Sequence, residues 1–333
     1  MSTDAGYQAA PGLAPGVAVE SEGLAVVART QGQLIRRRFL RHRAALLGMI
    51  TLSLVIILAY SSVGFGPVPG WWDKSYLHTA PVVDGGRPTL SVVPEFLGGS
   101  GVHLGEHPFG QDDVGKDYFA MVMRGTQQSL IVAFLIGFVV TVVGTLVGAL
   151  AGFFRGRVEA ALMRLTDVMI AIPTLIFAAI FAAVAGRTGN IVVLGVVLGL
   201  VTWTGLARLV RGEFLALREK EFVEAARAVG TGSWRIIYKH ILPNSVSVII
   251  VTATLAVAAG ILLETALSFL RLGIQPPEIS LGNLVSQYQT AMQTRPWLFW
   301  WPGLFIVAIA LSVNFIGDGL RDAFDPRQTR VRA

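Results

Sequence analysis

The chain contains no cysteine among its 333 residues, and charged side chains make up only 14% of it. The lack of cysteine excludes disulfides and thiolate metal sites. The low charge, beside 53% hydrophobic residues, excludes an ordinary soluble domain, in which about 25% of residues are charged. These absences together indicate a protein that lies in a membrane.

Long apolar runs support this interpretation. Six runs have the length needed to cross roughly 30 Å of hydrocarbon, which takes about 20 residues in a helix. The alternating pattern of barrel strands is absent, and helices satisfy their backbone amides internally. The sequence therefore predicts an all-α polytopic membrane protein with six transmembrane helices, near residues 44–60, 130–154, 168–185, 191–209, 246–270 and 297–316.

The positive charges are distributed unevenly between the two sides of these helices. Of the 27 Lys and Arg residues, 20 fall in segments on the same side as the N-terminus. The positive-inside rule then predicts that both termini are cytoplasmic. The net charge of +6 thus reflects membrane topology, and no nucleic-acid partner is expected.

This topology divides the chain into five parts. A cytoplasmic tail (1–43) with a Gly- and Pro-rich, disordered start precedes the first helix (44–60), and Arg36-Arg37 before it resembles an export signal that lacks a cleavage site. An outer loop (61–127) follows, with Trp71 and Trp72 as candidate interfacial anchors and an excess of acids that suits a cap or docking surface. A five-helix core (128–317) contains a cytoplasmic stretch at 213–244, and a second cytoplasmic tail (318–333) ends the chain.

One outer-loop stretch imitates two enzyme motifs. Residues 107–117 (HPFGQDDVGKD) nearly match a nucleotide phosphate loop, but Asp117 replaces the Ser or Thr that holds magnesium and no strand precedes it. Residues 103–107 have the order His-x-x-Glu-His of a zinc peptidase, which requires a helix. Gly105 and Pro108 disfavour one there. We expect neither nucleotide binding nor a metal site in this loop.

Small residues recur at four-residue spacing in the predicted core. Gly144, Gly148 and Gly152 form two successive G-x-x-x-G steps, and Gly195 with Gly199 forms a third. Such steps let helices approach closely in lipid. We expect these glycines to pack helices together rather than to line a permeation path.

The cytoplasmic stretch carries the most informative pattern. Phe222, Ala225, Ala226 and Val229 have the spacing of an apolar helix stripe, and Gly230 is placed to end that helix in the left-handed conformation. Ser233 is a candidate N-cap for a second helix with a stripe at Trp234, Ile237, Tyr238 and Ile241, closed by Pro243. Such short helices are marginal alone. Three roles are open for these stripes: packing on the protein's own helices, lying on the lipid interface, or docking on a partner.

A family resemblance favours docking. Glu224-Ala225-Ala226, then Gly230, then Leu242-Pro243 resemble the EAA loop of ABC importer permeases. With His240 two residues before Leu242, this loop resembles that of the dipeptide and oligopeptide branch. Residues 107–117, 264–285 and 314–327 also resemble that branch, although Gln111 stands where Thr is usual and Lys116 where Arg is more common. The nearest subunit type is the "C" permease of a peptide importer.

The resemblance implies a function, a set of partners and candidate site residues. It implies a non-catalytic permease subunit in a bacterial plasma membrane, paired with a second permease, two ATPase subunits and an extracytoplasmic binding protein. ATP and Mg²⁺ would bind the ATPase subunits, with no cofactor in this chain. The residues expected to couple to the ATPases are Glu224, Ala225, Ala226, Gly230, Trp234, Arg235, Leu242 and Pro243.

Few ionisable residues fall within the predicted membrane helices, and Glu264 is the exception. It faces the pathway, where it contacts a peptide amine or pairs with an Arg, or else it packs or snorkels near the outer end of its helix. The alternatives to an ATP-driven importer are an ion-coupled secondary peptide transporter and, less favoured, a membrane metalloprotease.

Overall fold

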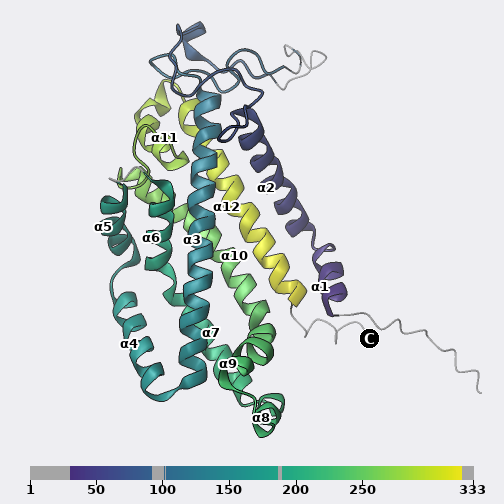
Figure 1. Cartoon of the computed structure of the whole chain (residues 1–333). Helices are drawn as coiled ribbons and strands as arrows, with labels where there is room; N and C mark the ends of the chain where they lie inside the picture. The colour runs from purple at the N-terminus through teal and green to yellow at the C-terminus, as the bar shows by residue number, and fades with distance from the viewer. Residues whose placement is uncertain (1–30, 92–100, 102, 187–189, 325–333) are drawn as a thin grey trace, which may run out of the picture.

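Figure 1 shows the computed structural model of the chain, which describes residues 31–91, 101, 103–186 and 190–324. Within this part the regular structure is helical, and the β-type contacts are isolated bridges in the outer loop. The predicted all-α class is confirmed. The disordered start predicted for residues 1–28 and the end of the C-terminal tail lie outside the described residues.

The helical elements run in the following order along the chain: α1 (Gln31–Phe39), α2 (Arg43–Ser62), η1 (Asp84–Gly86), α3 (Tyr118–Phe154), α4 (Gly156–Ala171), α5 (Thr174–Gly186), α6 (Ile191–Thr202), α7 (Thr204–Arg218), α8 (Glu221–Ala228), α9 (Ser233–Ile236), the π-helical η3 (Ile237–Ile241), α10 (Leu242–Phe269), α11 (Leu281–Tyr288), η4 (Gln289–Gln293) and α12 (Trp297–Phe324).

Four uninterrupted helices of the described chain are long and apolar enough to cross a membrane: α2, α3, the continuous run Ser233–Phe269, and α12. The predicted number of six is reached when two bent pairs each count as one crossing. These pairs are α4 with α5, bent by 89°, and α6 with α7, bent by 50°. The runs predicted near 168–185 and 191–209 therefore each contain a break, between α4 and α5 and between α6 and α7.

The sharper of these bends has a clear local cause. Pro173 separates α4 from α5, and proline lacks the amide that would continue the helix. The preceding Ile172 is extended, with φ −86° and ψ 128°, as expected for a residue crowded by the proline ring. One predicted membrane run thus becomes two helices almost at right angles.

Helix α3 is the central element of the bundle and packs against α6, α7 and α10 (Figure 1). A Cβ at Gly148 would lie 2.5 Å from the carbonyl oxygen of Ala207, and one at Gly152 would lie 2.6 Å from the Cβ of Phe214, both on α7. Gly199 likewise faces Val139 across α6 and α3. The predicted packing role of these glycines is confirmed.

The start of α3 differs from the sequence prediction. It begins at Tyr118, whereas residues 118–127 were expected in the outer loop and the membrane helix near 130. The Asp117 carboxylate caps the helix by accepting a hydrogen bond from the Ala120 amide at 2.9 Å. Tyr118 and Phe119 are buried beneath the outer loop. Tertiary burial therefore extends the helix beyond the apolar run.

Candidate functional site

The coupling segment, residues 213–244, lies at the end of the bundle opposite the outer loop (Figure 1). Its helix α8 has Glu221 and Glu224 in the first turn and Arg227 in the last, which complements the helix dipole at both ends. At its end the Gly230 amide donates to the carbonyl of Arg227 at 2.9 Å and the Thr231 amide to that of Ala226 at 3.0 Å. This is a Schellman cap.

Gly230 has φ +77°, so its predicted left-handed conformation is confirmed. A Cβ at this position would meet no atom within 4 Å. The requirement for glycine therefore comes from the backbone conformation alone and not from crowding.

The apolar stripe predicted on α8 is split between two faces. Ala226 is 7% exposed and Val223 is fully buried, whereas Phe222 is 40% and Val229 81% exposed. Val223, which the stripe omitted, turns inward because the helix packs on α7 and η3. Glu224 and Ala225 also face outward. The structure thus leaves an exposed stripe formed by Phe222, Ala225 and Val229.

The second short helix also differs in detail from its prediction. Ser233 is the first helical residue and Gly232 occupies the N-cap, without a side-chain cap. Ile237 and Ile241 are buried as the stripe requires, but Trp234 and Tyr238 are more than half exposed. Trp234 packs edge-on against Phe154 at the end of α3, with ring centroids 5.9 Å apart.

Pro243 does not close the coupling segment as predicted. It lies in the first turn of α10, where a missing amide is tolerated. The five residues Ile237–Ile241 before it widen into a π-helix, and such local widening accommodates a proline within a continuous helix. Arg235 is exposed and Leu242 half-buried nearby. Helices α9 and α10 therefore form one continuous rod from the coupling segment into the membrane.

Glu264 lies inside the bundle and not on an open surface. Its carboxylate is fully buried and accepts hydrogen bonds from the hydroxyls of Ser268 at 2.6 Å and Ser129 at 2.9 Å. The Ser129 oxygen in turn accepts from the Leu281 amide at 3.2 Å. The carboxylate joins α10, α3 and α11. Of the expected alternatives, this geometry matches packing, and no arginine partner is recorded for Glu264 in the described part.

The outer clasp, residues 107–117, is built from buried polar groups. His107 and Asp117 are about 95% or more buried, and their Nδ1 and Oδ1 atoms are 2.7 Å apart. The Lys74 ammonium lies 3.2 Å from His107 Nε2. Because an ammonium only donates, Nε2 accepts and Nδ1 carries the proton toward Asp117. The other carboxylate oxygen accepts from Trp72 Nε1 at 2.8 Å.

These contacts differ from the geometry that either imitated motif requires. Asp117 fills the N-terminus of α3 with its own carboxylate, which is where a phosphate would have to sit. His103 is exposed, and neither it nor His107 lies on a helix. The residues that the structure describes contain no group of three His, Asp or Glu side chains placed to hold a metal.

Several ion pairs of the described residues were not predicted from the sequence, and two of them join distant segments of the bundle. Near the loop 61–127, Arg124 of α3 binds Glu278 with two nitrogens at 2.9 and 3.2 Å. Toward the opposite end, Arg208 of α7 binds Asp167 of α4 at 2.5 Å. Their partners are distant in sequence, so no local pattern reveals them, although charges bordering apolar runs are the one available signal.

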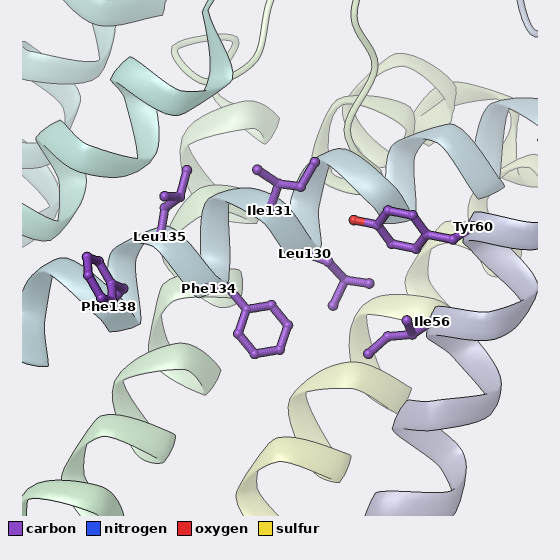
Figure 2. Close-up of a pocket in the computed structure, with 7 residues that line it drawn as sticks. All are labelled: Ile56, Tyr60, Leu130, Ile131, Phe134, Leu135 and Phe138. Carbon is purple, nitrogen blue, oxygen red and sulfur yellow. The ribbon is translucent and has the colours of Figure 1, made fainter. Parts of the chain in front are cut away.

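An open apolar groove of ≈ 450 Å³ lies between α2 and α3. Figure 2 shows Ile56 and Tyr60 of α2 facing Leu130 and Phe134 of α3 across it. The lining contains no charged side chain. It fits hydrocarbon and offers nothing that would bind the charged ends of a peptide.

Comparisons with known proteins agree with this architecture. The family described as "Binding-protein-dependent transport system inner membrane component" matches residues 144–330. The "N-terminal TM domain of oligopeptide transport permease C" matches residues 30–72. The chain therefore belongs to the family of binding-protein-dependent inner membrane transport components. It is a membrane-embedded permease subunit of an ABC importer, and it is not the subunit that hydrolyses ATP.

Individual relatives match almost end to end. The oligopeptide transport system permease protein OppC of Escherichia coli K12 is 39% identical over 310 residues, which cover 92% of this chain and 95% of the relative. OppC of Mycobacterium tuberculosis H37Rv is 35% identical over 299 residues, covering 90% and 96%. A putative peptide permease protein of Brucella ovis is 36% identical, covering 87% and 89%. Within the family the chain is thus OppC-like.

Proposed function

We propose that this permease subunit carries peptides, as the names of its relatives state for them, and that it works with a second permease, two ATPase subunits and an extracytoplasmic binding protein. ATP and Mg²⁺ bind to the ATPase subunits, and this chain needs no cofactor. The membrane is a bacterial plasma membrane with both termini in the cytoplasm, as the distribution of Lys and Arg supports.

The exposed stripe of α8 supports the proposed ATPase contact most directly. Phe222 and Val229 present apolar surface to solvent from a helix of eight residues. Exposed apolar patches of this kind are typical of a helix that docks in a groove. Ala225 between them is small enough to permit close approach, and Glu224 borders the stripe with a charge.

The remaining coupling residues transmit motion in this proposal. Gly230 fixes the turn between α8 and α9, while Trp234 and Arg235 lie on α9. Leu242 and Pro243 begin α10, which continues into the membrane without a break. When the ATPase subunits close, displacement of α8 is carried along this rod and changes the access of the pathway.

The docking contact is tested by placing charge on the stripe. In the double variant Phe222→Asp, Val229→Asp we expect the chain to insert normally but to lose its ATPase subunits on affinity purification, because two carboxylates would be desolvated in the groove. The matched control is Ala228→Asp, which adds one charge to an exposed position off the stripe. Full retention of both ATPases by the double variant would contradict the proposal.

The energy source and cargo have a separate test. We expect uptake of labelled oligopeptides by cells that contain the complete importer to stop when ATP is depleted. Uptake should continue when only the proton gradient is collapsed. The reverse result would favour an ion-coupled secondary transporter. Binding assays with the partner binding protein then identify which peptides are carried.

A further inference from the structure

Three arginines converge at the inner end of the bundle, where α3 turns into α4 and α7 leads to α8. Arg218 and Arg227 place their guanidinium carbons 5.6 and 5.9 Å from the centre of the Phe153 ring. Arg155 follows directly after α3. Arg218 also contacts the backbone carbonyl of Phe153, two residues before Arg155, so the three positive charges lie around one turn and are here called the arginine cluster.

The arginine cluster carries more positive charge than its recorded partners neutralise. Glu219 pairs with Arg155 at 2.5 Å, and Arg218 donates to the carbonyl of Phe153. The Nε atoms of both Arg155 and Arg218 are buried without a hydrogen-bond partner. Buried guanidinium nitrogens are normally satisfied. One carboxylate for three guanidinium groups leaves an excess charge of +2, which calls for an anion.

The N-terminus of α4 adds to the positive potential at this point. The helix begins at Gly156 directly after Arg155, and no side chain caps it. The Glu159 carboxylate in its first turn is bound by Arg211, with Nε to Oε1 at 2.8 Å. The α4 dipole therefore reinforces the arginine cluster as an anion site.

The position of the cluster along α3 identifies the kind of anion. The apolar run from Leu130 to Phe154 is long enough, at 1.5 Å per residue, to fill about 30 Å of hydrocarbon, and Arg155 is the first charged residue after it. Beside the cluster, Phe154, Trp234 and Tyr238 are 40%, 57% and 56% exposed. Exposed Trp and Tyr mark the membrane–water interface. Arg155, directly after the apolar run, is therefore at the level expected for lipid phosphates.

The helical geometry of α8 separates this cluster from the ATPase-docking stripe. At about 100° per residue, Arg227 lies roughly 170° around the helix from the centre of the stripe formed by Phe222, Ala225 and Val229. A partner seated on the stripe therefore approaches from the opposite side. The cluster faces the chain's own α3–α4 turn instead.

We infer that Arg155, Arg218 and Arg227 form a binding site for the phosphate of an anionic phospholipid headgroup. A phosphate oxygen accepts hydrogen bonds from several guanidinium nitrogens at once, and basic pockets between helices at the cytoplasmic surface suit such headgroups. The bound lipid would connect α8 to the α3–α4 turn and relieve the repulsion among the three arginines.

The test measures lipid binding to the detergent-solubilised full chain by native mass spectrometry, with phosphatidylglycerol and phosphatidylcholine titrated separately. We expect one phosphatidylglycerol to bind in preference to phosphatidylcholine. The double variant Arg218→Gln, Arg227→Gln should bind it at least about tenfold more weakly. Arg157→Gln, which removes an exposed charge on α4 outside the cluster, should bind it as the wild type does.

Further arms distinguish other occupants and a folding defect. The Arg218→Lys, Arg227→Lys variant keeps the charge and should restore much of the binding, while an unchanged melting temperature shows that the glutamine variant is folded. Equal binding of both lipids, or equal losses in the cluster and control variants, would overturn the inference. So would saturation of the site by inorganic phosphate in preference to lipid, or displacement of the lipid by added ATPase subunits.

Discussion

The coupling segment and the outer clasp lie at opposite ends of the bundle, and they differ in which kind of side chain they bury. The clasp buries polar groups and pairs them, as in the chain from Lys74 through His107 to Asp117. The coupling segment exposes apolar groups, with Val229 81% accessible. A buried, satisfied network holds a structure together, whereas exposed apolar surface is available to a partner. The difference separates a structural motif from a proposed docking surface within one chain.

Removing a buried hydrogen-bond partner from the outer clasp should therefore reduce the stability of the protein the most. We expect Asp117→Ala to lower the stability of the solubilised protein by about 3 kcal/mol, because it leaves His107, Trp72 and the start of α3 without their acceptor. Thermal unfolding followed by tryptophan fluorescence measures this effect. Asp113→Ala, at an exposed neighbouring position, should change the melting temperature little. Equal effects of the two variants would remove the structural basis of the comparison.

A substitution at the turn of the coupling segment should instead affect the local stability of α8. Gly230→Ala forces a Cβ into the left-handed region at a cost of about 1–2 kcal/mol, while Gly232, with an ordinary φ of −66° and free space around it, accommodates alanine. We expect amide hydrogen exchange across α8 to be roughly tenfold faster in Gly230→Ala than in Gly232→Ala. Identical exchange in both variants would show that the turn does not depend on Gly230.

The smallest expected effect lies where the clasp meets α11. The Tyr288 hydroxyl donates to Asp112 at 3.0 Å, and burial together with the Asp112 charge raises the pKa of Tyr288 above its usual 10.0. Unfolded Tyr288 ionises near pH 10 but the folded residue stays neutral, so this stability is present below pH 10 and is lost as pH rises beyond it.

The variant Tyr288→Phe tests that dependence. At neutral pH it should cost about 1 kcal/mol for the lost hydrogen bond, and its melting temperature should fall less steeply than that of the wild type above pH 10. Tyr238→Phe, at an exposed position of the coupling segment, is the control and should leave the melting temperature at neutral pH unchanged. A wild-type profile that stays flat above pH 10 would count against the buried contact.

Most of the fold was predictable from sequence because its cause is local. Apolar runs long enough to span lipid specify helices wherever they occur, and Gly230 specifies a helix end through its own backbone freedom. The ends of the helices were harder to predict from the sequence. Tyr118 to Gln127 looked like loop residues, and they became helical because the Asp117 cap and the outer loop stabilise them.

The sequence predicted where the coupling segment lies in the chain, but not which of its side chains form the exposed surface. The spacing of Phe222, Ala225, Ala226 and Val229 specified a short helix, and only its contacts with α7 and η3 decided that Ala226 turns inward with Val223 while the others face out. Glu264 was recognisable as an unusual charge in a membrane helix, and Ser268 is one turn away on that helix, but its second serine partner, Ser129, lies on α3 and only folding brings it close. Sequence by itself determined the membrane class, the helices and the position of the coupling segment, since hydrophobicity and glycine act within a few residues. Tertiary structure alone decided which faces are buried, where α4 and α5 turn, and how three arginines from three segments meet, because burial and charge act between residues that only folding brings together.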